Sequence, residues 1–473
     1  MFLCLVGTGC LRSVLEDIQN LRFIMKSIDK KIWLILVLLF MISGNATVAQ
    51  SIPSDIEAVV APFDMPKLSR PVIPDRTLSI VKTGARQEVL STKHIQKAID
   101  RLSQKGGGTV VIPEGKWLTG RIVLRSNICL RLEKGAELHF SGDIKDYLPV
   151  VLSRNEGIDV YSLGAMIYAA DAENIAITGE GKLVGPDYDC EICQRQEGGI
   201  SEDVGKTPVE QRIYDGGNGA KVFLPVFFGP MNSRNILVEG VTFEHSIFWN
   251  IVPTYCENII IRGVTVNSFG RGRTDGIDID SSANALIEYT TLDCGDDCFT
   301  LKSGRGIDGV KRARPTENVV IRYCVVRRGV GGVTMGTETA AGIRNVYMHD
   351  CVMENPSFPF YVKTRRPRGG GAENVLVERV VVEKSRKTVF KFDMLGSVEW
   401  IGELAERFPA RTVGVLTPKF GNMTFKDIII KECPALINAK GLPEQPIEGL
   451  VFENIQSPNM QMQLQDVGTL VFK

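Results

Sequence analysis

The sequence has no excess of charge of either sign. Its 473 residues include 55 Lys and Arg and 55 Asp and Glu, so the formal net charge is zero. Strong positive charge is the usual signature of a nucleic-acid partner, and we therefore expect none. Aromatic residues are also few, at 7%, whereas 47 residues are glycine. This composition suits many tight turns between short strands.

No apolar run is long enough for a comfortable membrane span, so we expect no stable membrane insertion. The apolar run Ile32–Ile42 follows three lysines and precedes small residues ending at Ala49. This order is typical of a secretory signal peptide cleaved after about Ala49. We expect translation to start at Met25, residues 1–49 to be an upstream extension plus signal peptide, and the mature protein to be periplasmic or secreted. A membrane anchor at the N-terminus is the alternative.

A repeated unit fills most of the remaining chain. Each unit has an asparagine, an alternating apolar strand, a short turn and a second short strand. Copies begin at Asn174, Asn235, Asn258, Asn284, Asn318, Asn345, Asn374 and Asn422, with a degenerate copy at Gly449. Several units lie roughly 23–34 residues apart, a repeat length typical of solenoids. The pattern predicts an all-β parallel β-helix whose coils bury their apolar faces by stacking. Leucine-rich repeats are the rival, but their closely spaced leucines are absent.

The repeat also sets the expected domain boundaries. Residues 75–473 should form one β-helix domain, and residues 50–74 an N-terminal linker. A short amphipathic helix at Lys93–Leu102, with Ser91 and Thr92 as candidate caps, should close its N-terminal end. We expect an asparagine amide at each bend to bind backbone groups.

Three short strands should follow the cap helix, at Thr109–Ile112, Ile122–Leu124 and Ile128–Leu132. Two long segments then interrupt the repeat, at residues 187–220 and 393–420. Insertions in solenoids usually map to one face, so we interpret both as walls of a cleft. A helix is expected within the second insertion, from Glu399 to Phe408. Solvated decoration of the surface is the alternative interpretation.

Nine cysteines follow the predicted leader, an odd number that cannot all pair within the chain. Cys256, Cys324 and Cys351 occupy similar places in their repeats, which favours stacked buried thiols over a disulfide framework. Cys190 and Cys193 form one isolated C-x-x-C pair, which we interpret as a local loop feature rather than a metal or redox site. The four histidines lie outside the acidic turns, and we expect packing or surface roles for them.

Two acidic turns in residues 273–304 are separated by one strand-like run. The first turn carries Asp275, with Asp278 and Asp280 behind it, and the second carries Asp296 and Asp297. Hydrolysis of a glycosidic bond requires an acid to protonate the leaving oxygen and a carboxylate to activate water. Crowded carboxylates also separate their pKa values, so that one keeps its proton near neutral pH. On spacing alone, aspartates that cap turns or hold calcium are an equal alternative.

The wider pattern resembles glycoside hydrolase family 28, the polygalacturonases and rhamnogalacturonan hydrolases. Residues 274–278 read T-D-G-I-D, residues 295–298 read G-D-D-C, and residues 302–304 read K-S-G. These motifs, in this order on a β-helix, are specific to that family. The resemblance implies a right-handed, pectin-lyase-like β-helix and an inverting hydrolase without metal or cofactor. It further implies Asp296 as general acid, with Asp275 and Asp297 holding and deprotonating the attacking water.

The sequence also departs from the family's pattern. Arg273 stands where the family's first motif has asparagine, Val330 replaces the histidine of a G-H-G motif, and Tyr361 replaces the arginine of an R-I-K motif. Lys363 survives, and an arginine-rich stretch follows it. A planar guanidinium can pair with a uronate carboxylate in a bidentate manner. The expected substrate-binding residues are Lys363, Arg365, Arg366, Arg368, Tyr361 and Val330. A solvated basic loop is the alternative for the arginines.

Together these features predict a monomeric hydrolase of α-galacturonosidic bonds in pectin, acting from the chain end because the insertions could close one end of the groove. Two alternatives remain open at this point: an endo-acting rhamnogalacturonan hydrolase, and a non-catalytic pectin-binding β-helix. Intact Asp275, Asp296 and Asp297 argue against the second. A pectate lyase would need calcium and a basic proton abstractor instead of paired acids.

Overall fold

A computed structural model describes residues 52–473 of the chain. The expected start at Met25, the leader and its cleavage after Ala49 lie outside the described residues. In the described part, no helix is both long and apolar enough to cross a bilayer.

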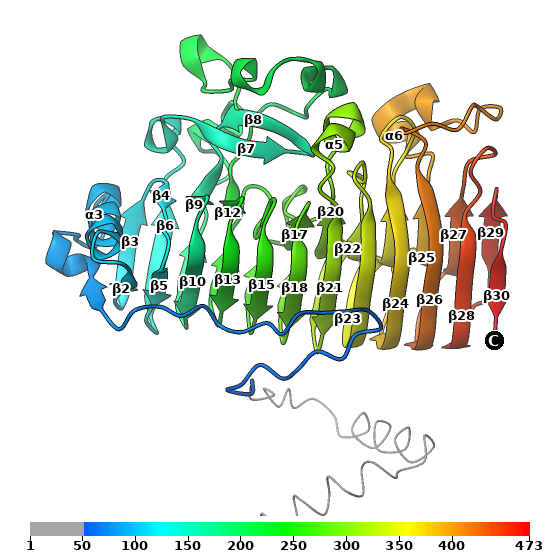
Figure 1. The fold of residues 1–473 in the computed structure, drawn as a ribbon, viewed down its shortest axis with the longest axis horizontal. Helices are drawn as coiled ribbons and strands as arrows, with labels where there is room; N and C mark the ends of the chain where they lie inside the picture. The colour runs from blue at the N-terminus through cyan, green and yellow to red at the C-terminus, as the bar shows by residue number, and fades with distance from the viewer. Residues whose placement is uncertain (1–51) are drawn as a thin grey trace, which may run out of the picture. The chain divides into compact units, whose positions relative to one another are not determined.

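The strands stack as successive coils, each strand pairing in parallel with its counterpart one coil further along (Figure 1). This is the parallel β-helix that the repeat predicted, with the right hand that parallel crossovers favour. The first of three strand rows consists of β1 (Thr77–Ser79), β2 (Gly108–Ile112), β5 (Ile128–Leu132), β10 (Glu173–Gly179), β13 (Arg234–Glu239), β15 (Glu257–Arg262), β18 (Ala283–Glu288), β21 (Thr316–Arg322), β23 (Ile343–Lys363), β24 (Gly371–Val382), β26 (Lys419–Ile430), β28 (Glu448–Gln456) and β30 (Leu470–Phe472).

Two further rows complete the coils. The second row consists of β3 (Gly115–Thr119), β6 (Ala136–Phe140), β11 (Lys182–Val184), β14 (Thr242–Glu244), β16 (Thr265–Asn267), β19 (Thr291–Asp293) and β22 (Val325–Met335). The third row consists of β4 (Ile122–Val123), β9 (Ala165–Ala170), β12 (Val226–Met231), β17 (Ile277–Asp280), β20 (Phe299–Lys302), β25 (Thr388–Asp393), β27 (Ala435–Lys440) and β29 (Met462–Gln465). The long strand β22 continues from the second row into the third, and β23 runs through all three rows, so both pair with members of the third row.

The predicted cap helix is confirmed as α3 (Thr92–Ser103), which turns Ile95, Ile99 and Leu102 into the core. Ser91 precedes this helix, but its hydroxyl donates to the Val89 carbonyl at 2.9 Å and makes no cap hydrogen bond. The three predicted strands are present as β2, β4 and β5. Two strands of this region, β3 and β6, were not predicted, because lysine and histidine interrupt their apolar pattern.

The repeated asparagines form one continuous row of side chains. All eight have left-handed backbone with φ between 53° and 60°, as the bend prediction required. From Asn174 to Asn345 their amides bind one another instead of the backbone groups that the sequence suggested, for example Asn258 to Asn235 at 3.1 Å and Asn284 to Asn258 at 3.3 Å. The amide ladder runs from Asn127 to Asn345. We call these seven residues the asparagine row.

Residues 52–74, which belong to the predicted linker, lie along the outer face of the first row. Their apolar members, including Phe63 and Leu68, pack on Ile260 and Leu286 and their neighbours in the coils. Arg70 adds an ion pair to Glu239 at 2.7 Å. This segment therefore covers apolar positions of the sheet that would otherwise face solvent.

The prediction of buried thiols is confirmed in the described residues for the three repeat cysteines, and all nine cysteines are free thiols. Cys256, Cys324 and Cys351 are each at most 2% exposed. Cys190 and Cys193 lie at a short helix, α4 (Glu191–Gln194), within the first insertion.

Several elements project from one edge of the coils, on the same side in Figure 1. The antiparallel hairpin β7 (Val151–Asn155) and β8 (Ile158–Ser162) and the helix α5 (Gly306–Arg312) were not predicted. In the second insertion, the predicted ten-residue helix is two short turns, α6 (Val398–Ile401) and η6 (Gly402–Ala405). Gly402 between them has φ 56°, which interrupts a regular helix. The remaining short 3₁₀ turns are η1 (Ile80–Thr83), η2 (Ile144–Tyr147), η3 (Glu202–Lys206), η4 (Val209–Gln211) and η5 (Gly217–Gly219).

Candidate active site

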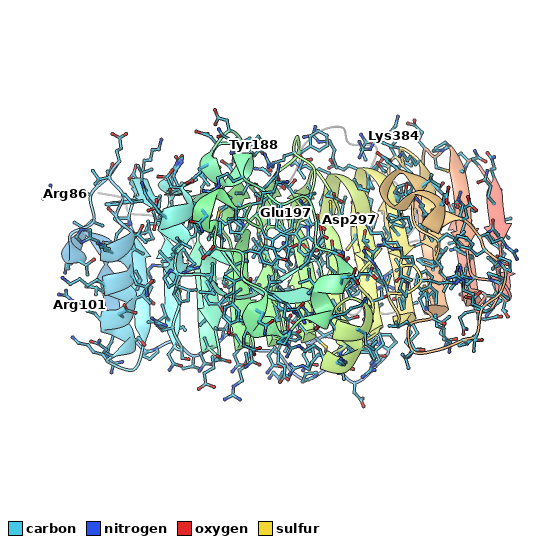
Figure 2. All side chains as sticks on the ribbon, turned by 90° about the horizontal axis from the view of Figure 1, so that it is seen from above. Arg86, Arg101, Tyr188, Glu197, Asp297 and Lys384 are labelled. Carbon is cyan, nitrogen blue, oxygen red and sulfur yellow. The ribbon has the colours of Figure 1, made fainter. Side chains whose placement is uncertain are left out.

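The two acidic turns lie on consecutive coils of the third row. Asp275 precedes β17 and Asp296 and Asp297 precede β20, and these two strands pair in parallel. Oxygens of the three carboxylates all lie within 4.8 Å of one another. Figure 2, viewed from above, places Asp297 among the middle coils. The sequence-based expectation that stacking brings these carboxylates together therefore agrees with their positions.

Close backbone approach makes this packing possible. A Cβ on Gly276 would lie 2.6 Å from the Cys298 carbonyl oxygen, and one on Gly295 would lie 1.7 Å from the Arg271 carbonyl oxygen. Any side chain at either position would push the two turns apart. The glycines of the two motifs thus set the distance between the aspartates.

Asp297 has one satisfied and one open oxygen. Its Oδ2 accepts a hydrogen bond from Lys363 Nζ at 2.7 Å. Its Oδ1 is buried and has no hydrogen-bond partner among the described residues. A Cβ on Gly331 would lie 2.6 Å from this Oδ1, so the adjacent glycine keeps the space beside it free. An unpaired buried acceptor is costly, and a water molecule there would relieve that cost.

Asp296 is the most accessible carboxylate of the three. Its Oδ2 accepts from the Arg273 amide at 3.2 Å and its Oδ1 from the Asp297 amide at 2.9 Å. Burial, and next the negative charge of Asp297, raise the pKa of Asp296. A partly exposed carboxyl with a raised pKa is suited to donating a proton to a substrate oxygen.

Asp275 and Asp278 form the deeper part of the acid cluster. Burial, with Asp278 and Asp296 adding to it, raises the pKa of Asp275 well above its usual value. Burial likewise raises the pKa of Asp278 to about 8. Asp278 therefore keeps its proton at neutral pH, and the raised pKa values of Asp275 and Asp296 favour the protonated form of these two groups as well.

Lys302 neutralises this deeper part and was assigned no role from the sequence. Its Nζ lies 3.8 Å from Asp275 Oδ2, 3.6 Å from Asp278 Oδ1 and 3.3 Å from Glu338 Oε2. The same ammonium lies 4.4 Å from the centre of the Trp249 ring. Its place in the K-S-G motif was the sequence signal that could have assigned Lys302 to the site. Asp280, by contrast, pairs at 2.8 Å with Arg154 of the β7–β8 hairpin and so lies outside the cluster.

Among the expected substrate-binding residues, Lys363 and Tyr361 lie beside the acids. The Lys363 ammonium lies 4.8 Å from the Tyr361 ring centre, and Lys391, another residue missed in the sequence, lies 4.7 Å from it. Val330 contacts the cluster through its backbone, where its amide donates to the Asp296 carbonyl at 2.8 Å.

The three arginines that follow Lys363 diverge. Arg366 makes a bidentate pair with Glu444, at 2.5 and 2.6 Å. Arg368 is 4% exposed and pairs with Glu338 at 2.7 Å. Only Arg365 is loosely held, at 3.5 Å from Glu202. The structure therefore does not gather the three guanidinium groups into one site with Lys363.

The calcium interpretation fits this chemistry less well. Three aspartate oxygens this close could contact a cation. Two of these carboxylates, however, already face an ammonium group, Asp297 facing Lys363 and Asp275 facing Lys302. Calcium prefers six to eight oxygen ligands without a competing cation. Proton transfer and activation of water suit the arrangement better.

Known proteins share this fold and site region. The profile of the family described as "Glycosyl hydrolases family 28" matches residues 215–391, a range that contains the whole acid cluster. A probable polygalacturonase of Vitis vinifera is 28% identical over 379 residues, 78% of this chain and 71% of that protein. An endo-polygalacturonase of Pectobacterium parmentieri is 25% identical, over 80% of this chain and 87% of that protein. The crystal structure of a hyperthermoactive exopolygalacturonase from Thermotoga maritima aligns with a TM-score of 0.74 at 30% identity, covering 86% of this chain and 93% of that one.

Proposed function

The chain belongs to glycosyl hydrolases family 28, and from this membership we propose that it hydrolyses α-galacturonosidic bonds in pectin. The observation that carries the proposal is the cluster of Asp275, Asp296 and Asp297 with its two lysines. A binding protein would have no need for buried carboxylates that hold protons and one unsatisfied oxygen. The relatives' names, all polygalacturonases, support a pectic substrate.

The three aspartates divide the acid and base roles of the proposed reaction between them. Asp296 donates its proton to the glycosidic oxygen as the bond to the anomeric carbon breaks. A water held at Asp297 Oδ1 and Asp275 attacks that carbon and gives up a proton to this pair. Lys363 holds Asp297 in position through the 2.7 Å ion pair to Oδ2, which leaves Oδ1 turned to the water.

We propose that the reaction inverts the anomeric configuration, as the family resemblance implies. One observation favours the alternative, in which the anomeric configuration is retained. The closest carboxylate oxygens lie within 4.8 Å, whereas inverting enzymes usually separate their carboxyl groups by about 6.5–9.5 Å and retaining enzymes by about 5–5.5 Å. Proton NMR of the first product decides between them. An initial β-anomer from an α-linked substrate supports inversion, and an initial α-anomer supports a covalent intermediate.

We further propose exo action. The two insertions meet at one pocket of about 370 Å³ that includes Arg365, two residues after Lys363. A wall at one end of a groove favours attack at a chain terminus. Product chromatography over time tests this proposal on homogalacturonan and on rhamnogalacturonan. Monomer from the first time point supports exo action, whereas an early ladder of mid-sized oligomers supports an endo-acting hydrolase.

A non-catalytic pectin-binding β-helix is excluded by turnover of any of these substrates. The matched test is Asp296→Asn, which keeps the shape of the side chain. Loss of turnover with unchanged thermal unfolding supports the catalytic assignment. Retention of more than about a tenth of wild-type activity contradicts it, because general acid catalysis contributes roughly 10²–10⁴-fold.

A further inference from the structure

The first insertion contains a motif that the proposed reaction does not use, the pair Cys190 and Cys193. The two cysteines span the single helical turn α4. Cα atoms three residues apart on such a turn are about 5 Å apart, inside the range of about 4.4–6.8 Å that a disulfide needs. The Cys193 thiol also donates a hydrogen bond to the Cys190 sulfur. The two sulfurs can therefore join without a rearrangement of the backbone.

The two thiols differ in accessibility. Cys190 is partly exposed and lines a cavity of about 330 Å³ together with His139 and Gly142. Cys193 is buried, at 6% exposed. A dissolved reagent can therefore reach the Cys190 sulfur, whereas Cys193 is placed to react with Cys190. An accessible thiol beside a second, resolving thiol is the usual arrangement of a redox-sensitive pair.

The local electrostatics favour a thiolate at Cys190. The hydrogen bond from Cys193 lowers the pKa of Cys190 to about 7, although burial opposes the change, and the positive charge of Arg271 makes a smaller contribution in the same direction. The hydrogen bond to Cys190 raises the pKa of Cys193, and burial adds to this effect. Because the thiolate is the nucleophile in disulfide exchange, Cys190 is the attacking thiol and Cys193 the resolving one.

Two buried thiol pairs in the described residues provide an internal comparison. Cys294 contacts Cys298, and Cys324 contacts Cys351. All four side chains are at most 2% exposed. Burial raises the pKa of Cys298 and of Cys324 well above the usual value. Contact between two sulfurs is therefore not sufficient for reactivity, and access combined with thiolate character separates the C-x-x-C pair from these two.

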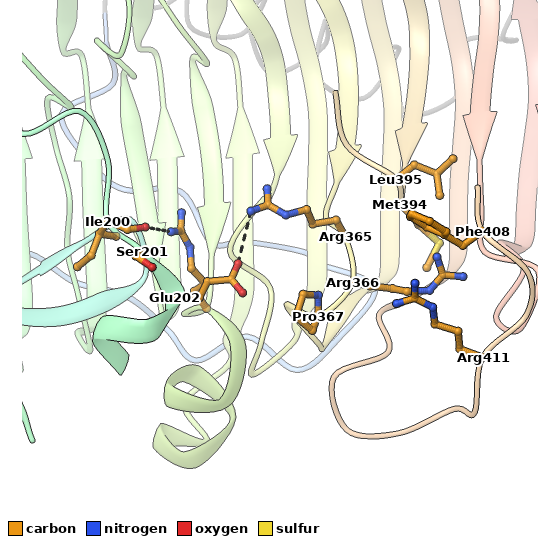
Figure 3. A pocket seen from close by; sticks show the side chains of 11 residues that line it. Ile200, Ser201, Glu202, Arg365, Arg366, Pro367, Met394, Leu395, Phe408 and Arg411 are labelled. Carbon is orange, nitrogen blue, oxygen red and sulfur yellow. Dashed lines mark hydrogen bonds and ion pairs between the residues drawn. The ribbon is translucent and has the colours of Figure 1, made fainter. Parts of the chain in front are cut away.

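The turn between the two cysteines attaches the first insertion to the coils. The Ile192 amide donates to the Gly142 carbonyl at 3.0 Å, and the Glu191 carboxylate accepts from the Ile144 amide at 3.0 Å. The Ile192 side chain is fully buried. Further along the same insertion, residues 200–202 line the pocket shown in Figure 3. A covalent link across α4 would therefore fix the start of a segment that reaches this pocket.

We propose that Cys190 and Cys193 form a redox site, at which a disulfide compound oxidises the two thiols to a disulfide that locks the α4 turn. The Cys190 thiolate attacks one sulfur of the compound, forms a mixed disulfide and releases the other half as a thiolate. The Cys193 sulfur then loses its proton, attacks the Cys190 sulfur and displaces the second half. Two electrons pass from the pair to the compound, and the two cysteine protons end on the two released thiols. This inference is independent of the proposed function.

The test exposes the folded protein to oxidised glutathione and maps its thiols by alkylation and peptide mass spectrometry. We expect wild type to form the Cys190–Cys193 disulfide and to keep the two buried pairs reduced. Cys193→Ser should stop at a mixed disulfide of glutathione on Cys190, because the resolving thiol is gone. Cys190→Ser is the matched variant and should carry no adduct, since Cys193 is buried. Free thiols at both positions in wild type overturn the redox site, and so does prior oxidation of a buried pair.

A second measurement tests the lock on α4. Limited proteolysis within residues 187–220 should be several-fold slower in the oxidised protein than in the reduced protein, because local opening of the turn precedes cleavage. Addition of a thiol reductant should restore the faster rate. Cys433→Ser is the control, since Cys433 is a buried thiol of the C-terminal coils and its replacement should leave the difference between the two rates unchanged. Equal cleavage rates in oxidised and reduced wild type overturn the lock.

Discussion

The asparagine row and the acid cluster are two solutions to the same stacking geometry. Parallel register places equivalent residues of successive coils next to each other. In the asparagine row the stacked groups are identical amides, each of which donates to one neighbour and accepts from the other. In the acid cluster the stacked groups are carboxyls, which repel one another when ionised and can then only accept hydrogen bonds.

This difference separates a part of the β-helix that contributes to stability from a part that supplies reactive groups. The amide ladder satisfies its own side chains, so it can be repeated along many coils. The acid cluster needs the cations Lys302 and Lys363, and Asp297 Oδ1 still has no partner among residues 52–473. An unpaired buried oxygen lowers stability, so we expect such an arrangement only where substrate and water can bind to it.

The largest expected effect comes from breaking the cluster's chemistry alone. Asp297→Asn should lower turnover by roughly 10²–10⁴-fold, because an amide cannot take a proton from water. The melting temperature should fall only modestly, since the amide keeps the size and shape of the side chain and its oxygen can still accept the hydrogen bond from Lys363. The measurement is kcat together with a thermal unfolding curve. Full activity in Asp297→Asn would show that the water-activating carboxylate lies elsewhere.

Breaking the cluster's charge balance should cost stability as well. Lys302→Met keeps the approximate length of the side chain. It leaves Asp275, Asp278 and Glu338 without their shared cation. Removing one partner of a buried ion pair costs about 3–5 kcal/mol. Chemical denaturation measures this loss. Lys182→Met is the control, because Lys182 forms an exposed pair with Glu244 worth about 0–1 kcal/mol.

A substitution in the asparagine row should cost about 3–4 kcal/mol, the lower part of the range expected at Lys302. Asn258→Ala removes two amide contacts and places alanine at φ 57°. Left-handed backbone costs about 1–2 kcal/mol for alanine, and each hydrogen bond adds about 1 kcal/mol. Asn258→Gly separates the two terms, because glycine accepts this φ and loses only the amide contacts. Equal destabilisation by both substitutions would mean that backbone strain contributes nothing.

The smallest expected effect is a shift in the pH profile. Asp278→Asn removes a negative charge beside Asp275, so the remaining carboxyls should ionise at lower pH. The active cluster needs a proton on its acid, and activity falls as pH rises through the cluster's pKa. The alkaline limb of kcat/KM against pH should therefore move down by about one unit, equivalent to about 1.4 kcal/mol. If the alkaline limb does not move, the essential proton is on a group whose pKa does not depend on the charge of Asp278.

The sequence predicted the fold and the acid cluster well, for a physical reason. Both depend on local patterns: a spaced asparagine before each apolar strand, and aspartates at fixed offsets in two neighbouring coils. Because the coil spacing is about 4.8 Å, residues one repeat apart must be neighbours in space. The projecting elements were predicted less well. The hairpin β7–β8 and helix α5 lie outside the repeat and make no periodic signal.

The arginines show the limit of reasoning from sequence spacing. By sequence, Arg365, Arg366 and Arg368 were equivalent candidates for a substrate carboxylate. Their partners Glu202, Glu444 and Glu338 lie 163, 78 and 30 residues away, respectively, so no local pattern reveals them. Arg411 was not a candidate at all, because its distance along the chain from Arg365 and Arg366 hides its place in the same pocket.

The sequence by itself determined that the chain stacks into coils and that three aspartates meet on two of them, because equivalent residues of successive repeats must become neighbours. Only the tertiary structure decided which cations are already paired and which oxygen of Asp297 has no partner among the described residues. These properties depend on insertions that fold back onto the coils from distant positions, where charges compensate each other across space and not along the chain.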